Sequence, residues 1–227
     1  MHLMTLFPLA CALALAGCGA APPTDAAGQP GSTAAASAEA AQPGDAARIP
    51  PTTDASRMDD LNRFVPEGAR IVDTVRGDLT GAGSDDVVLV VSPAASGDGK
   101  LGEGVPRSVL LLTRDATGAL RKAAENARLV PCATCGGTAG DPYAFSRIEA
   151  GTLTIAVSGG SRERWFDNYV FRYAPAQQRW TLVQVVRGVS DTMTEQRRQI
   201  ELTGEELGDV AFPDFDPATL RKTATLD

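Results

Sequence analysis

Short runs of strand-forming residues, each ended by turn-forming residues, are the feature that most constrains how this chain folds. Between residues 69 and 202 the runs are rich in Val, Ile, Tyr and Trp, and Gly, Pro, Asn and Asp stand between them. This pattern predicts a mainly β domain of antiparallel sheets, arranged as a meander or as propeller-like sheets. The predicted strands are Ala69–Val75, Val87–Val91, Ser108–Thr113, Leu129–Val130, Thr152–Ser158, Tyr169–Tyr173, Trp180–Val186 and Gln199–Leu202.

Short helices are expected at both ends of this β region. Ser56–Phe64 carries apolar residues three positions apart, a spacing that keeps them on one face of a helix. Near the C-terminus, Asp216 precedes a proline, which is the pattern of a helix N-cap with proline in the first turn. A second short helix is therefore predicted over Pro217–Lys222.

Residues 1–17 form an apolar run that ends directly before Cys18. The run is shorter than the roughly 20 residues that a helix needs to cross a bilayer, and it is typical of an export signal. Leu15–Cys18 resembles the lipobox of bacterial lipoproteins, although residues 1–17 lack the usual Lys or Arg. The resemblance implies cleavage before Cys18 and acylation of its thiol and amine with palmitate-like chains. In the alternative, an ordinary secretory signal, Cys18 is incidental.

Residues 18–55 contain this cysteine and a segment dominated by Ala, Pro, Gly, Ser and Thr, without an aromatic residue. Such a segment buries too little apolar surface to offset the entropy of ordering, so it predicts a disordered tether. Residues 56–227 then form a single β-rich domain. The net charge of −7 lies outside the export signal, and an acidic balance argues against nucleic-acid binding. By resemblance to sorted lipoproteins, Gly19 favours the outer membrane, facing the periplasm.

His2 is the only histidine in the chain. Removal of the signal therefore leaves a protein without imidazole, which excludes Ser-His-Asp and Cys-His catalysis and imidazole metal sites. Paired carboxylates or a Ser-Lys pair stay open as catalytic groups, but no pattern in the sequence nominates them. The sequence therefore favours a protein that is not an enzyme.

The most specific motif is the Gly-rich stretch Gly77–Val91, in which acidic and small residues precede an apolar strand. Oxygen ligands in a sharply turning loop suit a hard cation such as Ca²⁺. The stretch resembles the calcium loop of FG-GAP and related β proteins. By that resemblance, the candidate ligands are Asp78, Thr80, Ser84 and Asp86.

The loop departs from that family at Ala82, where the family has a carboxylate. With one charged ligand fewer, only weak calcium binding is expected. The alternative is a metal-free turn of the same shape, in which Asp78 and Asp86 accept hydrogen bonds from loop amides.

Cys132 and Cys135 are the two cysteines that accompany Cys18 once the signal is removed. An exported chain meets an oxidising compartment, so a disulfide between them is expected. A redox-active pair is the alternative, but Gly136 and Gly137 follow where a thioredoxin-like motif continues as a helix. A zinc site would need two further Cys or His ligands, which the sequence does not supply.

Ser158–Tyr169 is interpreted as a glycine-hinged loop that carries Arg162, Arg164 and Trp165. Arg and Trp are the residue types that most often anchor protein interfaces. These three residues are therefore the candidate partner-binding residues. The alternative is a twisted hairpin whose aromatic side chains pack inward and whose charges are solvated.

Four segments together resemble a family of bacterial periplasmic lipoproteins with a degenerate calcium loop. They are Val65–Gly68, Gly77–Val91, Leu129–Gly137 and Ser158–Tyr173. Some members of that family are immunity proteins of bacteria-killing type IV secretion systems, which block a peptidoglycan hydrolase. The resemblance implies a lipid-anchored module that binds a periplasmic protein such as a cell-wall hydrolase. The alternatives are a structural or assembly lipoprotein of the envelope and an enzyme that uses carboxylates.

Overall fold

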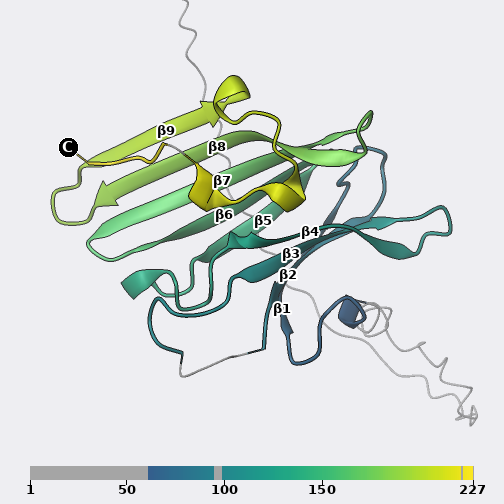
Figure 1. The fold of residues 1–227 in the computed structure, drawn as a ribbon, viewed down its shortest axis with the longest axis horizontal. Helices are drawn as coiled ribbons and strands as arrows, with labels where there is room; N and C mark the ends of the chain where they lie inside the picture. Colours follow the sequence, from purple (N-terminus) through teal and green to yellow (C-terminus); the bar gives the residue numbers. More distant parts are fainter. Residues whose placement is uncertain (1–60, 95–98, 221, 227) are drawn as a thin grey trace, which may run out of the picture. The chain divides into compact units, whose positions relative to one another are not determined.

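Two antiparallel sheets carry the fold in the computed structural model, which describes residues 61–94, 99–220 and 222–226 (Figure 1). Within each sheet the strands follow one another in sequence order, so both sheets are meanders. The prediction of a mainly β, antiparallel meander is confirmed. Sheet A contains β1 (Arg70–Gly77), β2 (Asp86–Ser92), β3 (Arg107–Arg114) and β4 (Leu120–Val130). Sheet B contains β5 (Tyr143–Glu149), β6 (Thr152–Gly160), β7 (Glu163–Ala174), β8 (Arg179–Asp191) and β9 (Arg197–Thr203).

The strand β2 is apolar at almost every position because both of its faces are covered. Successive side chains of a strand point to opposite faces of the sheet. Val88 and Val90 enter the core that both sheets share, whereas Val87 and Leu89 belong to a second cluster with Leu61. A strand buried on both faces has no reason to alternate with polar residues.

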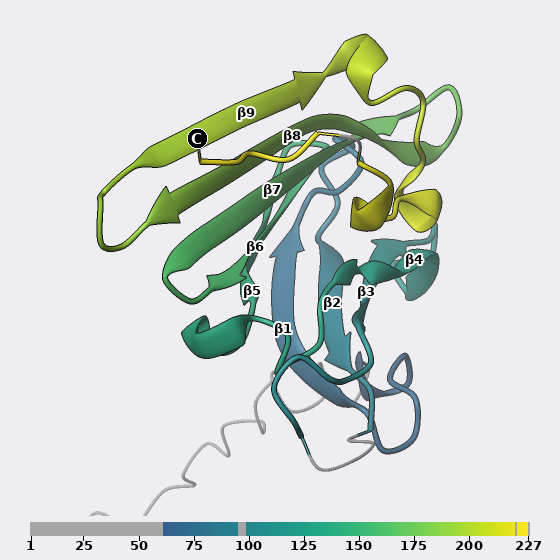
Figure 2. The ribbon, with the colours of Figure 1, turned by 60° about the vertical axis from the view of Figure 1, so that its left-hand side comes forward.

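The shared core extends from the two sheets to the C-terminal segment. The ring centroids of Tyr169 and Phe215 are 5.1 Å apart, and those of Phe171 and Phe212 are 5.0 Å apart, both in edge-to-face geometry. The C-terminal segment, yellow in the ribbon, therefore lies against sheet B (Figure 1, Figure 2). The 3-10 turn η3 (Phe212–Asp214) in this segment carries one of these aromatic rings.

Asn126 fastens this C-terminal segment to β4. Its side chain is buried, and its Nδ2 donates to the carbonyl oxygens of Phe212 (2.6 Å) and Phe215 (2.8 Å). Its Oδ1 accepts the amides of Arg128 (2.8 Å) and Leu129 (2.9 Å). Every donor of the buried amide group is used, as the cost of burying unpaired polar groups requires.

The edge strands differ most from the sequence prediction. The pattern predicts only Leu129–Val130 where β4 extends over Leu120–Val130, and it predicts no strand where β5 lies. Each is the outermost strand of its sheet, and each exposes several polar side chains. An edge strand buries fewer side chains, and the pairing of β4 with β3 is also irregular, so neither segment shows a regular apolar alternation.

The predicted terminal helices are largely absent from the described residues. Of Ser56–Phe64, residues 56–60 lie outside the described residues, and Leu61–Asn62 form the end of a helical turn. Pro217–Lys222 is not a helix, because η4 (Pro217–Thr219) is a single 3-10 turn, after which the backbone becomes extended. Asp216 does cap that turn by accepting the amide of Ala218 at 2.9 Å. The predicted tether, residues 18–55, lies outside the described residues.

Candidate functional site

The loop after β1 is organised around the carboxylate of Asp78. It accepts the amides of Thr80 (3.2 Å), Gly81 (2.7 Å), Ala82 (3.0 Å) and Gly83 (2.6 Å). Desolvation raises the pKa of this carboxyl, but the four amides outweigh it and hold the pKa below its ordinary value. An ionised Asp78 therefore closes the turn from within.

Asp86 holds the other end of the same loop and is fully buried. Its two oxygens accept the amides of Leu79 (3.2 Å) and Arg114 (3.1 Å). Both carboxylates therefore already accept hydrogen bonds from backbone amides. A calcium ion bound in this loop would have to share the carboxylate oxygens with those amides. Among the residues that the structure describes, no group of three or more Asp, Glu, Cys or His is placed to hold a metal ion. Calcium binding by this loop stays a prediction.

The indole of Trp180 connects this loop to sheet B. Its Nε1 donates to the carbonyl oxygen of Leu79 at 2.8 Å, and both residues are buried. The acidic loop is therefore joined to the core on one side and closed by Asp78 on the other. The loop therefore keeps its shape through the Trp180 hydrogen bond and the amides bonded to Asp78.

Cys132 and Cys135 form a disulfide, as predicted, with their Cα atoms 5.1 Å apart. The amide of Cys135 also donates to the carbonyl oxygen of Cys132 at 3.0 Å, so the loop is tight. The chain continues into the single 3-10 turn η1 (Gly137–Ala139). A thioredoxin-like motif would continue into a helix at this point.

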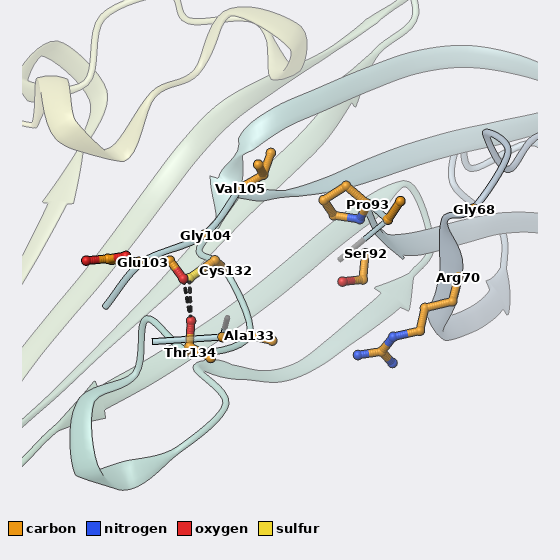
Figure 3. Close-up of a pocket in the computed structure, with 12 residues that line it drawn as sticks. Gly68, Arg70, Ser92, Pro93, Glu103, Gly104, Val105, Cys132, Ala133 and Thr134 are labelled. Atoms are coloured by element: carbon orange, nitrogen blue, oxygen red, sulfur yellow. Dashed lines mark hydrogen bonds between the residues drawn. The ribbon is translucent and has the colours of Figure 1, made fainter. Parts of the chain in front are cut away.

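The disulfide loop supports a neighbouring loop and lines a pocket of about 310 Å³ (Figure 3). The hydroxyl of Thr134 donates to the carbonyl oxygen of Glu103 at 2.7 Å, and the amide of Gly102 donates to the Thr134 carbonyl at 2.8 Å. Cys132 lies on the same side of the pocket as these residues, and Arg70 lies opposite. The disulfide loop therefore stabilises the segment that precedes β3 through these hydrogen bonds.

The predicted glycine-hinged loop Ser158–Tyr169 is wrong, because most of it belongs to two paired strands. The strand β6 runs to Gly160 and β7 begins at Glu163, so the turn contains only Ser161 and Arg162. Gly160 has a φ of +106°, and a Cβ there would lie 2.0 Å from the carbonyl oxygen of Glu163. This turn therefore requires glycine.

Trp165 lies in β7 on the face that points into the core. Its ring lies over Gly159, where a Cβ would come within 2.7 Å of the ring. The ring also lines an apolar pocket of about 290 Å³ together with Cys132, Cys135 and Tyr169. The structure thus brings two separate sequence motifs together, and it packs the tryptophan inward as the hairpin alternative implies.

The two predicted arginines are held near the turn by polar contacts. Arg164 is half-buried and donates to the carbonyl oxygen of Gly160 at 3.2 Å. The Nε of Arg162 donates to Asp191 at 2.8 Å, while 65% of the Arg162 side chain stays exposed. Of the three predicted partner-binding residues, Arg162 projects furthest into solvent.

Asp191 joins this turn to the β8–β9 turn beside it. Its Oδ1 accepts the amides of Met193 (2.7 Å) and Thr194 (3.0 Å), and Thr192 donates its amide and its hydroxyl to the Arg162 carbonyl. The Met193 amide contributes most to lowering the pKa of Asp191, against the opposing effect of desolvation. The two turns therefore behave as one bonded unit.

Sequence reasoning missed three exposed or half-buried residues at this end of sheet B. Met193 is 75% exposed, and Phe166 is half-buried on the face opposite to Trp165. Arg197 is exposed and pairs with Ser190. A strand predicted through Arg164, Trp165 and Phe166 would have placed Trp165 on one face and its two neighbours on the other, because successive side chains of a strand point to opposite faces.

Cys18 lies outside the described residues, so its lipidation stays a prediction. In the part of the chain that the structure describes, no helix is both long enough and apolar enough to cross a membrane. Comparison of the chain with models of protein families, with curated proteins and with solved structures finds no match.

Proposed function

We propose that this protein is a non-catalytic, lipid-anchored module on the periplasmic side of the outer membrane that binds and inhibits a peptidoglycan hydrolase. The observation that carries the proposal is the bonded pair of turns at the end of sheet B, from which Arg162 projects. The export signal ending at Cys18 and the absence of histidine after residue 2 support the location and the non-catalytic role.

An inhibitor needs a preformed surface more than it needs reactive groups. Binding is weakened by the entropy lost when side chains and loops become ordered. Asp191 already holds Arg162 and closes the neighbouring turn, so part of that ordering is present before a partner arrives. The contact surface is therefore partly preorganised.

The chemistry of this surface suits the active site of a glycosidase. Lysozyme-like enzymes place two carboxyl groups across the cleft in which the sugar chain is cut. A guanidinium forms paired, charge-assisted hydrogen bonds with a carboxylate. An arginine-bearing turn that enters such a cleft would block the substrate and bond to its acidic groups.

The test is the hydrolysis of purified peptidoglycan by wall hydrolases that are encoded beside this gene or that co-purify with the full-length protein. We expect inhibition at equimolar protein, and Arg162→Ala should weaken it by about 2 kcal/mol, roughly thirtyfold in affinity. Arg172→Ala, at the other end of β7, is the matched control and should inhibit normally. If every hydrolase stays fully active in excess protein, the proposal fails and a structural or assembly role becomes the better account.

A further inference from the structure

We infer that one end of sheet B is a docking surface for an acidic protein, formed by Arg162, Arg164, Phe166, Met193 and Arg197. We call these five residues the arginine surface. The inference rests on the proposed function where it names a hydrolase as the partner. It goes beyond that function because it assigns the contact to two strands and two turns and gives the partner's sign of charge.

Strand pairing brings most of these side chains to one face. Arg164 pairs with Ser190, which in turn pairs with Arg197, so the two arginines project from the same face of sheet B. Two residues further along β7, Phe166 projects from that face and pairs with Gly188. The face is the one opposite to the core, because Trp165 between them points inward.

A hollow of about 580 Å³ lies beside Phe166. Its lining consists of Phe166, Val189, Ser190, Arg197, Arg198 and Gln199. The ring of Phe166 covers Gly188 of β8, since a Cβ there would come within 2.0 Å of a ring carbon. An aromatic wall next to guanidinium groups suits a side chain with an apolar stem and a carboxylate end, such as glutamate.

The two turns extend this surface beyond the hollow. Met193, at 75% exposure, is the most exposed large apolar side chain among the residues that the structure describes. An unbranched thioether adapts to irregular partner surfaces, and methionine is common at such contacts. Because Asp191 bonds to both Arg162 and the Met193 amide, the two side chains are presented from a fixed base.

The charge of this region is opposite to that of the whole chain, which is −7. The arginines on this face and its two turns are Arg162, Arg164 and Arg197, whereas Arg198 follows Arg197 in β9 and points to the other face. Glu163 precedes Arg164 in β7 and also points to that other face, which leaves Asp191 and Glu195 as the acidic residues of the two turns, and Asp191 is already bonded to Arg162. A cationic patch steers acidic partners toward it by electrostatic attraction. The carboxylate-lined cleft of a glycosidase has the matching charge.

The experiment compares the same charge reversal at two ends of one sheet face. Arg197→Glu alters the arginine surface, and Arg172→Glu makes the identical change at the far end of β7, on the same face. Both arginines are exposed, so neither change removes a core contact. Binding of the full-length protein, in detergent, is measured to poly-L-glutamate and separately to any hydrolase that the protein inhibits.

We expect Arg197→Glu to weaken binding to both probes by about tenfold or more, and Arg172→Glu to change it by less than about twofold. Met193→Ala should weaken hydrolase binding, whereas Leu101→Ala, an equally simple truncation of an exposed apolar residue, should not. If Arg197→Glu and Arg172→Glu weaken binding equally, the inference is overturned, because binding would then depend only on the net charge of the protein. Undiminished binding by Arg197→Glu would overturn it as well.

The two probes separate this inference from the proposed function. If no hydrolase is inhibited, the proposed function fails, but binding to poly-L-glutamate still decides whether the arginine surface accepts carboxylates. Raised salt should weaken wild-type binding to poly-L-glutamate strongly and the binding of Arg197→Glu less, because exposed charges are screened. If the wild-type protein does not bind poly-L-glutamate at low salt, the inference is contradicted.

Discussion

Replacement of Asn126 by Asp tests how the C-terminal segment is held, with almost no change in side-chain volume. The substitution removes the Nδ2 group that donates to the carbonyl oxygens of Phe212 and Phe215. A buried polar group left without a partner costs about 1–3 kcal/mol, so two such groups cost about 2–6 kcal/mol at neutral pH. Domains of this size unfold at a cost of about 5–15 kcal/mol, so the variant should lose much of its stability.

The stability loss caused by Asn126→Asp should depend on pH, and the burial of the introduced carboxyl determines the direction of that dependence. Burial next to carbonyl oxygens raises the pKa of the introduced carboxyl above the value near 3.9 that it has in the unfolded chain. A group whose folded pKa is raised contributes its full stability below the unfolded pKa and loses it as the pH rises through the folded pKa. The protonated acid also donates one hydrogen bond, so near pH 4 the loss should fall toward about 1–3 kcal/mol.

Urea unfolding followed by tryptophan fluorescence, near pH 4 and near pH 8, measures this loss as a shift of the midpoint at constant slope. Asn62→Asp is the control, because Asn62 is exposed and its substitution should change stability by no more than about 0.5 kcal/mol. The reasoning is refuted if Asn126→Asp unfolds at the wild-type midpoint. It is also refuted if the loss is the same at both pH values.

Three other predictions concern the sequence motifs. Cys18→Ala should release the protein from the membrane fraction, and a variant that still sediments with outer membranes would contradict lipidation. Thiol counting on denatured, unreduced protein should find no free thiol at Cys132 or Cys135, and replacing both by Ala should cost about 2 kcal/mol, the closure entropy of a short loop. Calcium at millimolar levels should raise the melting temperature of the wild type but not of Asp78→Ala. Without any shift in the wild type, the metal-free turn is the better account.

The interior strands were predictable because their own residues carry the signal. The strand β2 was expected at Val87–Val91 and is observed at Asp86–Ser92, since a strand covered on both faces must be apolar throughout. The edge strand β5 was missed because its exposed side chains leave no regular apolar pattern. The C-terminal helix was overestimated because Asp216 and the following proline specify how a helical turn starts but not how long it continues.

The candidate site was predictable only in part. The disulfide joins residues three positions apart, so an oxidising compartment and the residue count were sufficient to expect it. Arg162 lies in the turn with 65% of its side chain exposed, and its role in partner binding stays a prediction. Trp165 was assigned to the contact because its residue type is common in interfaces, yet its side chain faces the core. Residue type carries a preference for interfaces, but the direction of the side chain follows from the strand register.

The sequence alone determined the strand-rich character of the chain and the pairing of two nearby cysteines. Each of these depends on residues within a few positions of one another, whose interactions do not need the rest of the fold. Only the tertiary structure decided which side chains share a face. Arg164 and Arg197 lie in line because β8 pairs with both β7 and β9, and Asn126 meets Phe215 because the C-terminal segment crosses back to β4. A shift of one residue in strand register would turn every side chain of that strand to the other face, so such contacts depend on long-range packing that no local pattern encodes.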